Sequence, residues 1–137
     1  MLCGPGEERE LAARIAAEAD HARVHSMADQ DLSLGVSKAV IERSNLVVTT
    51  DSGPRHIAAA FRVPSLVICG PTDPAVNFNY HAGEQAITLR MSCSPCRAND
   101  CPLGHNRCVR DITPALVAKA ARDDSERCLS WQQPTFH

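Results

Sequence analysis

The residues best suited to chemistry lie in one short turn between a hydrophobic segment and a helix. Leu46 to Thr50 is a mostly β-branched run with the length of a buried strand, and the typical turn sequence Asp51-Ser52-Gly53 follows it. Pro54 then stands where a helix accepts proline as its first residue. A helix N-terminus presents unpaired backbone N–H groups and the positive end of the helix dipole. The turn therefore predicts an anion site, and phosphate is the anion that suits it best.

The side chains of this turn suit different tasks. Ser52, Gly53 and the backbone beyond them can hold a phosphate, and Gly53 lets a ligand approach the backbone closely. His56, in the first helical turn, can add a hydrogen bond or a positive charge. Asp51 is a carboxylate and would not itself hold a phosphate, so a capping role or a sugar hydroxyl suits it better. The alternative is an ordinary strand-to-helix turn in which Asp51 or Ser52 caps the helix.

Four cysteines form the second group of reactive side chains. The chain has seven cysteines, and an odd number argues against a complete disulfide framework. Four thiolates in one short loop can close tetrahedrally on zinc, which we favour over an iron–sulfur cluster. Reduced thiols, or two disulfides in an oxidising compartment, are the alternative. The four are Cys93, Cys96, Cys101 and Cys108.

Hydrophobic segments and helical patterns alternate along the chain. The hydrophobic segments are apolar throughout rather than on one face, which is typical of strands buried in a parallel sheet. The sequence therefore predicts an α/β fold with a Rossmann-like parallel sheet and flanking helices. The expected helices are 7–19, 33–45, 54–61 and 115–122, and the expected strands are 22–25, 46–50, 64–69 and 86–89.

Three loops are expected to meet at one edge of this sheet, because ligands of parallel sheets bind beyond the carboxyl ends of the strands. They are Gly4-Pro5-Gly6, Asp51-Ser52-Gly53 and Gly70-Pro71-Thr72-Asp73. Glu7 follows the first loop and can accept hydrogen bonds from a ribose, with Glu8 as the next candidate. A solvated helix start is the alternative for both glutamates.

Composition is that of an ordinary soluble globular domain. Of 137 residues, 44% are hydrophobic and 22% are charged, and the formal net charge is −2. This balance gives no indication of a nucleic-acid partner, and no segment reads as a membrane span or a secretory signal. We expect a partial domain over 1–122 with a cysteine-rich loop at 91–110, followed by a polar tail at 123–137. Only Met1 to Cys3 precede the Gly-Pro-Gly loop where a whole strand is normal, which suggests a fragment.

These motifs together resemble the lipopolysaccharide heptosyltransferases of glycosyltransferase family 9. The likeness covers the C-terminal half of such an enzyme and is closest to the type that adds the second heptose of the inner core. It rests on Gly4-Pro5-Gly6-Glu7, Ser33-Leu34, Asp51 to Ala60, Gly70 to Pro74 and the cysteine run from Cys93 to Cys108.

The resemblance implies a donor-binding domain from a two-domain GT-B fold, with ADP-heptose as the donor. Ser52, Gly53 and His56 would contact the diphosphate, with Pro54 opening the helix between them. Asp51 would contact the heptose or the loop, Glu7 the ribose, and Leu32 would flank the adenine. No cofactor is required for transfer, because a helix N-terminus and His56 can stabilise the charge of the leaving group.

The chain departs from this family in length. A complete member is more than twice as long, and the acceptor domain with the catalytic base has no counterpart here. The resemblance therefore implies no catalytic residue in this chain and no activity without the missing domain. The complete enzyme would work in the cytoplasm, at the inner membrane face, on a lipid-linked oligosaccharide. The alternatives are a zinc-stabilised binding module with a vestigial nucleotide site and a transferase that uses another nucleotide-sugar.

Overall fold

The computed structural model describes residue 1, residues 6–77 and residues 81–131, and it describes side chains up to residue 123. The described chain forms two compact units, Met1–Val40 and Ile41–His137. Each unit is described by itself below.

The first unit contains α1 (Glu7–Ala19) and most of α2 (Leu34–Glu42). Three glutamates occupy the first turn of α1, where the helix dipole favours negative charge. Ser33 caps α2, because its Oγ accepts the N–H of Val36 at 3.2 Å. Both predicted helices are thereby confirmed.

The strand predicted at 22–25 is wrong. His21 draws the chain into a tight turn: its carbonyl accepts the N–H of Val24 at 2.8 Å and its Nδ1 accepts the N–H of Arg23 at 3.1 Å. These bonds use backbone donors that a strand would need. Slightly later in the chain, Met1 donates to the His25 carbonyl at 2.5 Å and accepts from the Met27 N–H at 3.0 Å.

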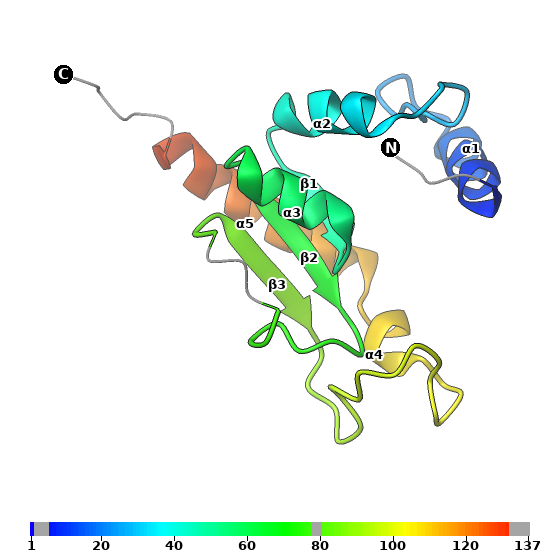
Figure 1. Cartoon of the computed structure of the whole chain (residues 1–137), viewed down its shortest axis with the longest axis vertical. Helices are drawn as coiled ribbons and strands as arrows, with labels where there is room; N and C mark the ends of the chain where they lie inside the picture. Colours follow the sequence, from blue (N-terminus) through cyan, green and yellow to red (C-terminus); the bar gives the residue numbers. More distant parts are fainter. Residues whose placement is uncertain (2–5, 78–80, 132–137) are drawn as a thin grey trace. The chain divides into compact units, whose positions relative to one another are not determined.

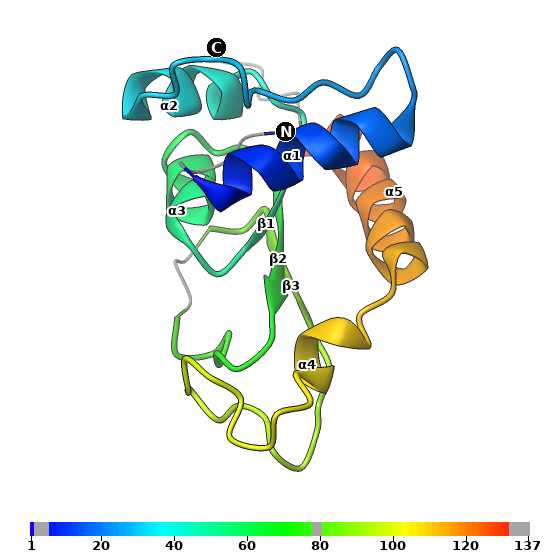
Figure 2. The ribbon, with the colours of Figure 1, turned by 90° about the vertical axis from the view of Figure 1, so that its right-hand side faces the viewer.

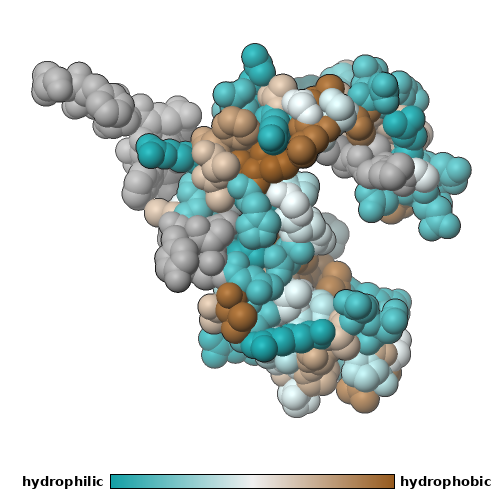
Figure 3. Space-filling view, viewed as in Figure 1, coloured by the Kyte–Doolittle hydropathy of each residue, from teal (hydrophilic) through white to brown (hydrophobic). Residues whose placement is uncertain are grey.

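Few apolar side chains are buried in the first unit. Ala12 and Ala28 are 5% and 4% exposed, whereas Leu11 and Leu34 are 52% and 63% exposed. On the face shown in Figure 3, hydrophobic residues accordingly gather over α2. The sequence predicts an apolar stripe along α1, but the described residues of this unit form no hydrophobic core that covers it.

The second unit is built on a three-stranded parallel sheet, as predicted. Its strands are β1 (Val47–Thr50), β2 (Ser65–Cys69) and β3 (Glu84–Thr88), in the order β1-β2-β3. Thr49 pairs with Val67, which in turn pairs with Ala86. The central strand carries the core, since Leu66 and Val67 are both 0% exposed. Burial on both faces explains why β2 is apolar throughout rather than alternating.

Helices cover both faces of this sheet (Figures 1 and 2). One face carries α3 (Gly53–Ala60) and the other carries α5 (Pro114–Trp131). Thr113 caps α5, because its Oγ1 accepts the N–H of Leu116 at 3.2 Å. The helix continues to Trp131, past residue 122 where the sequence predicted its end.

Loops from three strands meet at the carboxyl edge of the sheet. The turn after β1, the loop after β2 and the segment after β3 all leave this edge, and α4 (Arg107–Arg110) lies there as well (Figure 1). Two of the three predicted loops are thus confirmed as neighbours. Gly4 and Pro5 lie outside the described residues, and Gly6 belongs to the first unit. In the part of the chain that the structure describes, every helix is too short or too polar to cross a membrane.

Gly70, directly after β2, is required by the packing of α4. A methyl group at this position would overlap the side chain of Val109 and lie 3.4 Å from Cys108 Sγ. We expect Gly70→Ala to lower the free energy of unfolding by about 1–3 kcal/mol, the usual cost of overfilling a packed site. Urea denaturation measures the change.

Gly53→Ala is the matched control. A methyl group at Gly53 meets no described atom within 4 Å, so this variant should keep the stability of the parent protein. Equal stability of Gly70→Ala and the parent would show that α4 is not packed against the end of β2 as described.

Candidate functional site

The turn after β1 leads into an open helix end. Ser52 is the N-cap of α3 in an extended conformation, and Pro54 stands in the first turn, as the sequence predicted. Ser52, Gly53 and His56 are exposed, whereas Pro54 is half-buried. A methyl group placed on Gly53 would meet open space among the described residues, which leaves room for a ligand at the backbone. The turn therefore keeps the features that suit a phosphate.

Neither the Asp51 nor the Ser52 side chain forms a capping hydrogen bond to α3, so the alternative of a side-chain cap is wrong for the described residues. The Ser52 hydroxyl points back and donates to the Thr50 carbonyl at 3.3 Å. Asp51 is engaged elsewhere, because Asn77 Nδ2 donates to its Oδ2 at 2.7 Å and Arg55 Nη1 donates to its Oδ1. The end of α3 is consequently left without a side-chain cap from the described residues.

Arg55 is the centre of a buried ion cluster. Its side chain is 1% exposed, and those of Asp51 and Glu84 are 12% and 4% exposed. Arg55 Nε donates to Glu84 Oε2 at 3.0 Å, and Nη2 donates to Glu84 Oε1 at 2.7 Å. Nη2 also donates to the Asn77 carbonyl at 2.5 Å. One guanidinium thereby connects the turn after β1, the loop after β2 and the first residue of β3.

The cluster holds Asp51 and Arg55 in their charged forms. Burial alone would raise the pKa of Asp51, but the hydrogen bonds from Asn77 and Arg55 and the Arg55 charge lower it below the ordinary value. Burial alone would lower the pKa of Arg55, but the hydrogen bonds to Glu84 and Asp51 and their charges raise it. Asp51 is therefore a fixed, ionised carboxylate.

Arg55 and Glu84 are the site residues that sequence reasoning missed. Arg55 occupies the variable position of the turn motif, and its spacing of four residues from Asp51 is the signal that could have found it. Glu84 gives no local signal, because it is 29 residues away in the sequence. Asn77, in the loop after β2, braces Asp51 through its side-chain amide.

Glu7 and Leu32 belong to the first unit. Glu7 is the exposed first residue of α1, and Leu32 is half-buried in the loop before α2. Their contacts with ribose and adenine remain predictions.

The four cysteines of the loop take different environments. Cys93 Sγ lies 3.9 Å from His105 Nε2, and Cys101 Sγ accepts the N–H of Asn106 at 3.5 Å. Cys96 is exposed, whereas Cys108 is buried near Gly70. All four are free thiols, and the described residues contain no group of three ligands that could hold a metal ion. The thiols therefore do not fit a tetrahedral zinc site in this arrangement, and zinc binding remains a prediction.

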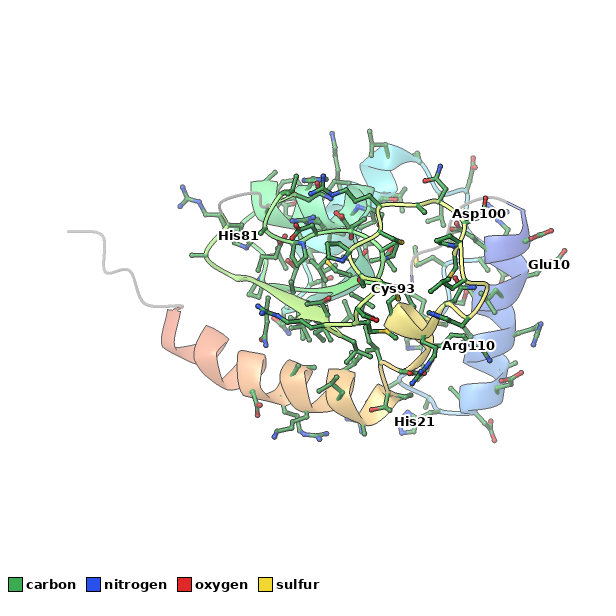
Figure 4. All side chains as sticks on the ribbon, turned by 90° about the horizontal axis from the view of Figure 1, so that it is seen from below. Glu10, His21, His81, Cys93, Asp100 and Arg110 are labelled. Carbon is green, nitrogen blue, oxygen red and sulfur yellow. The ribbon has the colours of Figure 1, made fainter. Side chains whose placement is uncertain are left out.

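Other polar groups in this loop are also spread out. Cys93 lies beside α4, whereas Asp100 lies in the outer part of the loop (Figure 4). His105 Nδ1 accepts the N–H of Arg107 at 3.0 Å, so the proton of a neutral ring is carried on Nε2, toward Cys93. Backbone N–H groups, first that of Asn106 and then those of residues 103–105, lower the pKa of Cys101. The loop thus has one polarised thiol and one thiol–imidazole contact.

His81 has a structural role. Its Nε2 lies 3.1 Å from the Val63 carbonyl, near the start of β2, and Figure 4 shows it well away from Cys93. His137 lies outside the described residues.

These features define a parallel α/β domain with an anion-suited helix end at the carboxyl edge of its sheet. The model of glycosyltransferase family 9 (heptosyltransferase) matches residues 1–106, and the chain belongs to this family.

Relatives in three bacteria carry heptosyltransferase names. Lipooligosaccharide heptosyltransferase 2 of Campylobacter jejuni subsp. jejuni serotype O:2 is 34% identical over 84 residues, which cover 58% of this chain and 25% of the relative. Lipopolysaccharide heptosyltransferase 1 of Pseudomonas aeruginosa is 34% identical over 98 residues, 72% of this chain and 26% of the relative. Lipopolysaccharide heptosyltransferase 2 of Escherichia coli K12 is 31% identical over 78 residues, which cover 57% of this chain and 22% of the relative.

The match thus spans about a quarter of each relative's length. No solved structure matches the chain significantly.

Arg55→Met tests the buried cluster. The substitution keeps an unbranched apolar stem but leaves the carboxylates of Asp51 and Glu84 without their guanidinium. We expect the free energy of unfolding to fall by about 3–5 kcal/mol, because removing the guanidinium leaves two buried carboxylates without a counter-charge. Urea denaturation at neutral pH measures the loss.

Arg14→Met is the control for this substitution. Arg14 pairs with Glu18 at 3.9 Å, and both side chains are 74% exposed. An exposed pair of this kind contributes at most about 1 kcal/mol. Similar losses in the two variants would argue against a buried network at Arg55.

Acid should reduce the contribution of Asp51 to the free energy of unfolding. Since the folded pKa of Asp51 lies below the ordinary value of 3.8, its ionisation stabilises the fold above that value and the contribution is lost as pH falls through the folded pKa. The difference in unfolding free energy between parent and Asp51→Asn should be constant above about pH 5 and shrink below it. Urea titrations across this range measure it, with Glu18→Gln as the exposed control. A difference that stays constant into strong acid would contradict the lowered pKa.

Proposed function

We propose that this chain is the donor-binding part of a heptosyltransferase and holds ADP-heptose by its diphosphate at the N-terminus of α3. The observation that supports it is the uncapped helix end at the carboxyl edge of a parallel sheet, with Gly53 open to a ligand. Ser52 and Gly53 offer the hydroxyl and backbone donors, and exposed His56 stands one helical turn further. This arrangement binds an anion through N–H groups and the helix dipole together.

The same groups serve the transfer reaction on the leaving-group side. When the sugar moves to an acceptor hydroxyl, negative charge develops on the departing diphosphate. N–H donors at a helix end and a histidine, already in place, stabilise that charge without a metal ion. Glu7 and Leu32, which belong to the first unit, are the proposed contacts of the ribose and the adenine.

The other half of the reaction belongs to a second domain. An acceptor hydroxyl needs a base to take its proton, and none of the residues assigned here has that role. We place the base and the lipid-linked oligosaccharide acceptor in the N-terminal domain of a complete GT-B enzyme, peripheral to the cytoplasmic face of the inner membrane. This chain by itself is then inactive in transfer but competent to bind the donor nucleotide.

His56→Ala tests the donor site. We expect ADP to bind the parent chain and to bind the variant about tenfold more weakly or worse, since a hydrogen bond to a charged group is worth about 1.5–3 kcal/mol. Isothermal titration calorimetry measures both affinities. His25→Ala, which removes another exposed histidine, should leave ADP binding unchanged.

Two results would favour the rival functions. UDP or GDP binding as tightly as ADP in parallel titrations would contradict the ADP-heptose donor and favour a transferase with another nucleotide-sugar. Bound zinc, measured by elemental analysis of the purified protein, together with no affinity for any nucleotide would favour the zinc-stabilised module. In that module the thiols of Cys93, Cys96, Cys101 and Cys108 would close on the metal only after the loop rearranges.

A further inference from the structure

The cysteines of the second unit differ in how open they are to solvent. Cys69 and Cys108 are buried, with 1% and 9% of their surface exposed. Cys93 is half-buried and Cys96 is exposed, and both are free thiols. Cys101 is half-buried as well. Among the described cysteines, a reagent in solution can therefore reach these last three.

The segment from 93 to 97 is folded against the loop after β2. Ser94 Oγ donates to the Gly70 carbonyl at 2.8 Å, and the Arg97 N–H donates to the Pro71 carbonyl at 2.8 Å. Neighbouring Cα atoms lie about 3.8 Å apart, whereas three extended steps span about 10 Å. Bonds from both ends of the segment to adjacent residues therefore favour a bent chain, and the backbone bends at residue 95.

A bent segment of this length suits a disulfide between Cys93 and Cys96. A disulfide needs its two Cα atoms about 4.4–6.8 Å apart, and the first and fourth residues of a tight turn lie within about 7 Å. The Cys-X-X-Cys spacing is also that of many thiol–disulfide exchange sites. A loop of so few residues costs less chain entropy to close than the longer loop to Cys101.

Cys101 is engaged in a turn of its own. Its carbonyl accepts the N–H of Gly104 at 2.9 Å, and its Sγ accepts the N–H of Asn106 at 3.5 Å. A disulfide from Cys101 would compete with this contact of its sulfur. A disulfide between Cys93 and Cys96 leaves the turn intact, and it uses neither of the bonds that hold the segment to the loop after β2.

We propose that Cys93 and Cys96 form a reversible disulfide by exchange with a small disulfide such as oxidised glutathione. The exposed Cys96 thiolate attacks one sulfur of the small disulfide, whose S–S bond breaks as one small thiolate leaves. The Cys93 thiolate then attacks the Cys96 sulfur and displaces the second small thiolate. The two cysteine protons end on the two released thiols, and two electrons pass from the protein to the small disulfide.

Peptide mass spectrometry tests this proposal on the full chain. Trypsin releases peptides 91–97 and 98–107, since each ends in arginine and follows one. The first contains both Cys93 and Cys96, and the second contains Cys101. The chain is treated with excess oxidised glutathione, the remaining thiols are alkylated, and the peptides are analysed without reduction. We expect peptide 91–97 to carry an internal disulfide, and dithiothreitol to restore both of its thiols.

Three results in the parent chain would overturn the proposal. A bond from Cys101 to either of the other two cysteines would join the two peptides. Peptide 91–97 that keeps both thiols free, or that holds glutathione without closing, would show that the pair does not form. Zinc in the purified protein that protects both thiols from glutathione would show that the loop is a metal site instead.

Cys93→Ser and Cys101→Ser separate the two exchange steps. Cys93→Ser lacks the thiol of the second step, so we expect glutathione to remain on Cys96. Cys101→Ser is the matched control and should close peptide 91–97 at the rate of the parent chain. Closure that is tenfold slower in Cys101→Ser, or Cys93→Ser that takes up no glutathione at Cys96, would contradict the order of steps. The parent chain gives the disulfide itself, so a variant that fails to fold does not remove the test.

Discussion

The structure of the second unit depends on one buried guanidinium. Arg55 reaches from α3 to Asp51 in the turn after β1 and to Glu84 at the start of β3, and it also binds the Asn77 carbonyl. Burying these charges costs free energy, which a close multidentate geometry offsets. What the cluster provides is position: it fixes the turn, the loop after β2 and the edge strand relative to one another. The turn that leads into the open end of α3 is therefore held in place by this cluster.

Different residues of this turn hold its backbone in place and face a possible ligand. The Asp51 carboxylate is bound at both oxygens, so it braces the turn from beneath. Ser52 and Gly53 are left exposed on the outside, without a capping side chain among the described residues. A turn held from within can leave its outer N–H groups unpaired, because its conformation does not depend on satisfying them.

Local features of this fold could be predicted from the sequence, whereas features set by distant contacts could not. Ser33 and Thr113 mark helix starts through their own hydroxyls, and the apolar run of β2 reports burial directly. The β-branched run of β1 predicts a buried strand too, but β1 is an edge strand on which Val48 is 49% exposed. The His21 turn replaced a strand because side-chain and carbonyl acceptors of a single residue captured the backbone. The Arg55–Glu84 pair spans 29 residues and follows no pattern that periodicity detects. The cysteine spacing predicts four thiols close together in the sequence but not the directions in which they point. In the structure Cys108 packs near Gly70, and Cys93 lies against His105.

The charges of the cluster also limit how the site can attract an anion. Two carboxylates share one guanidinium beneath the turn, so the cluster itself does not supply positive charge to a phosphate above it. The attraction must come from outside the cluster, and the described residues of this turn offer two sources. One is the N-terminus of α3, whose dipole carries roughly half a positive charge. The other is His56, which stands on the exposed side of the same helix and can add a hydrogen bond or a positive charge to an anion held at the helix end.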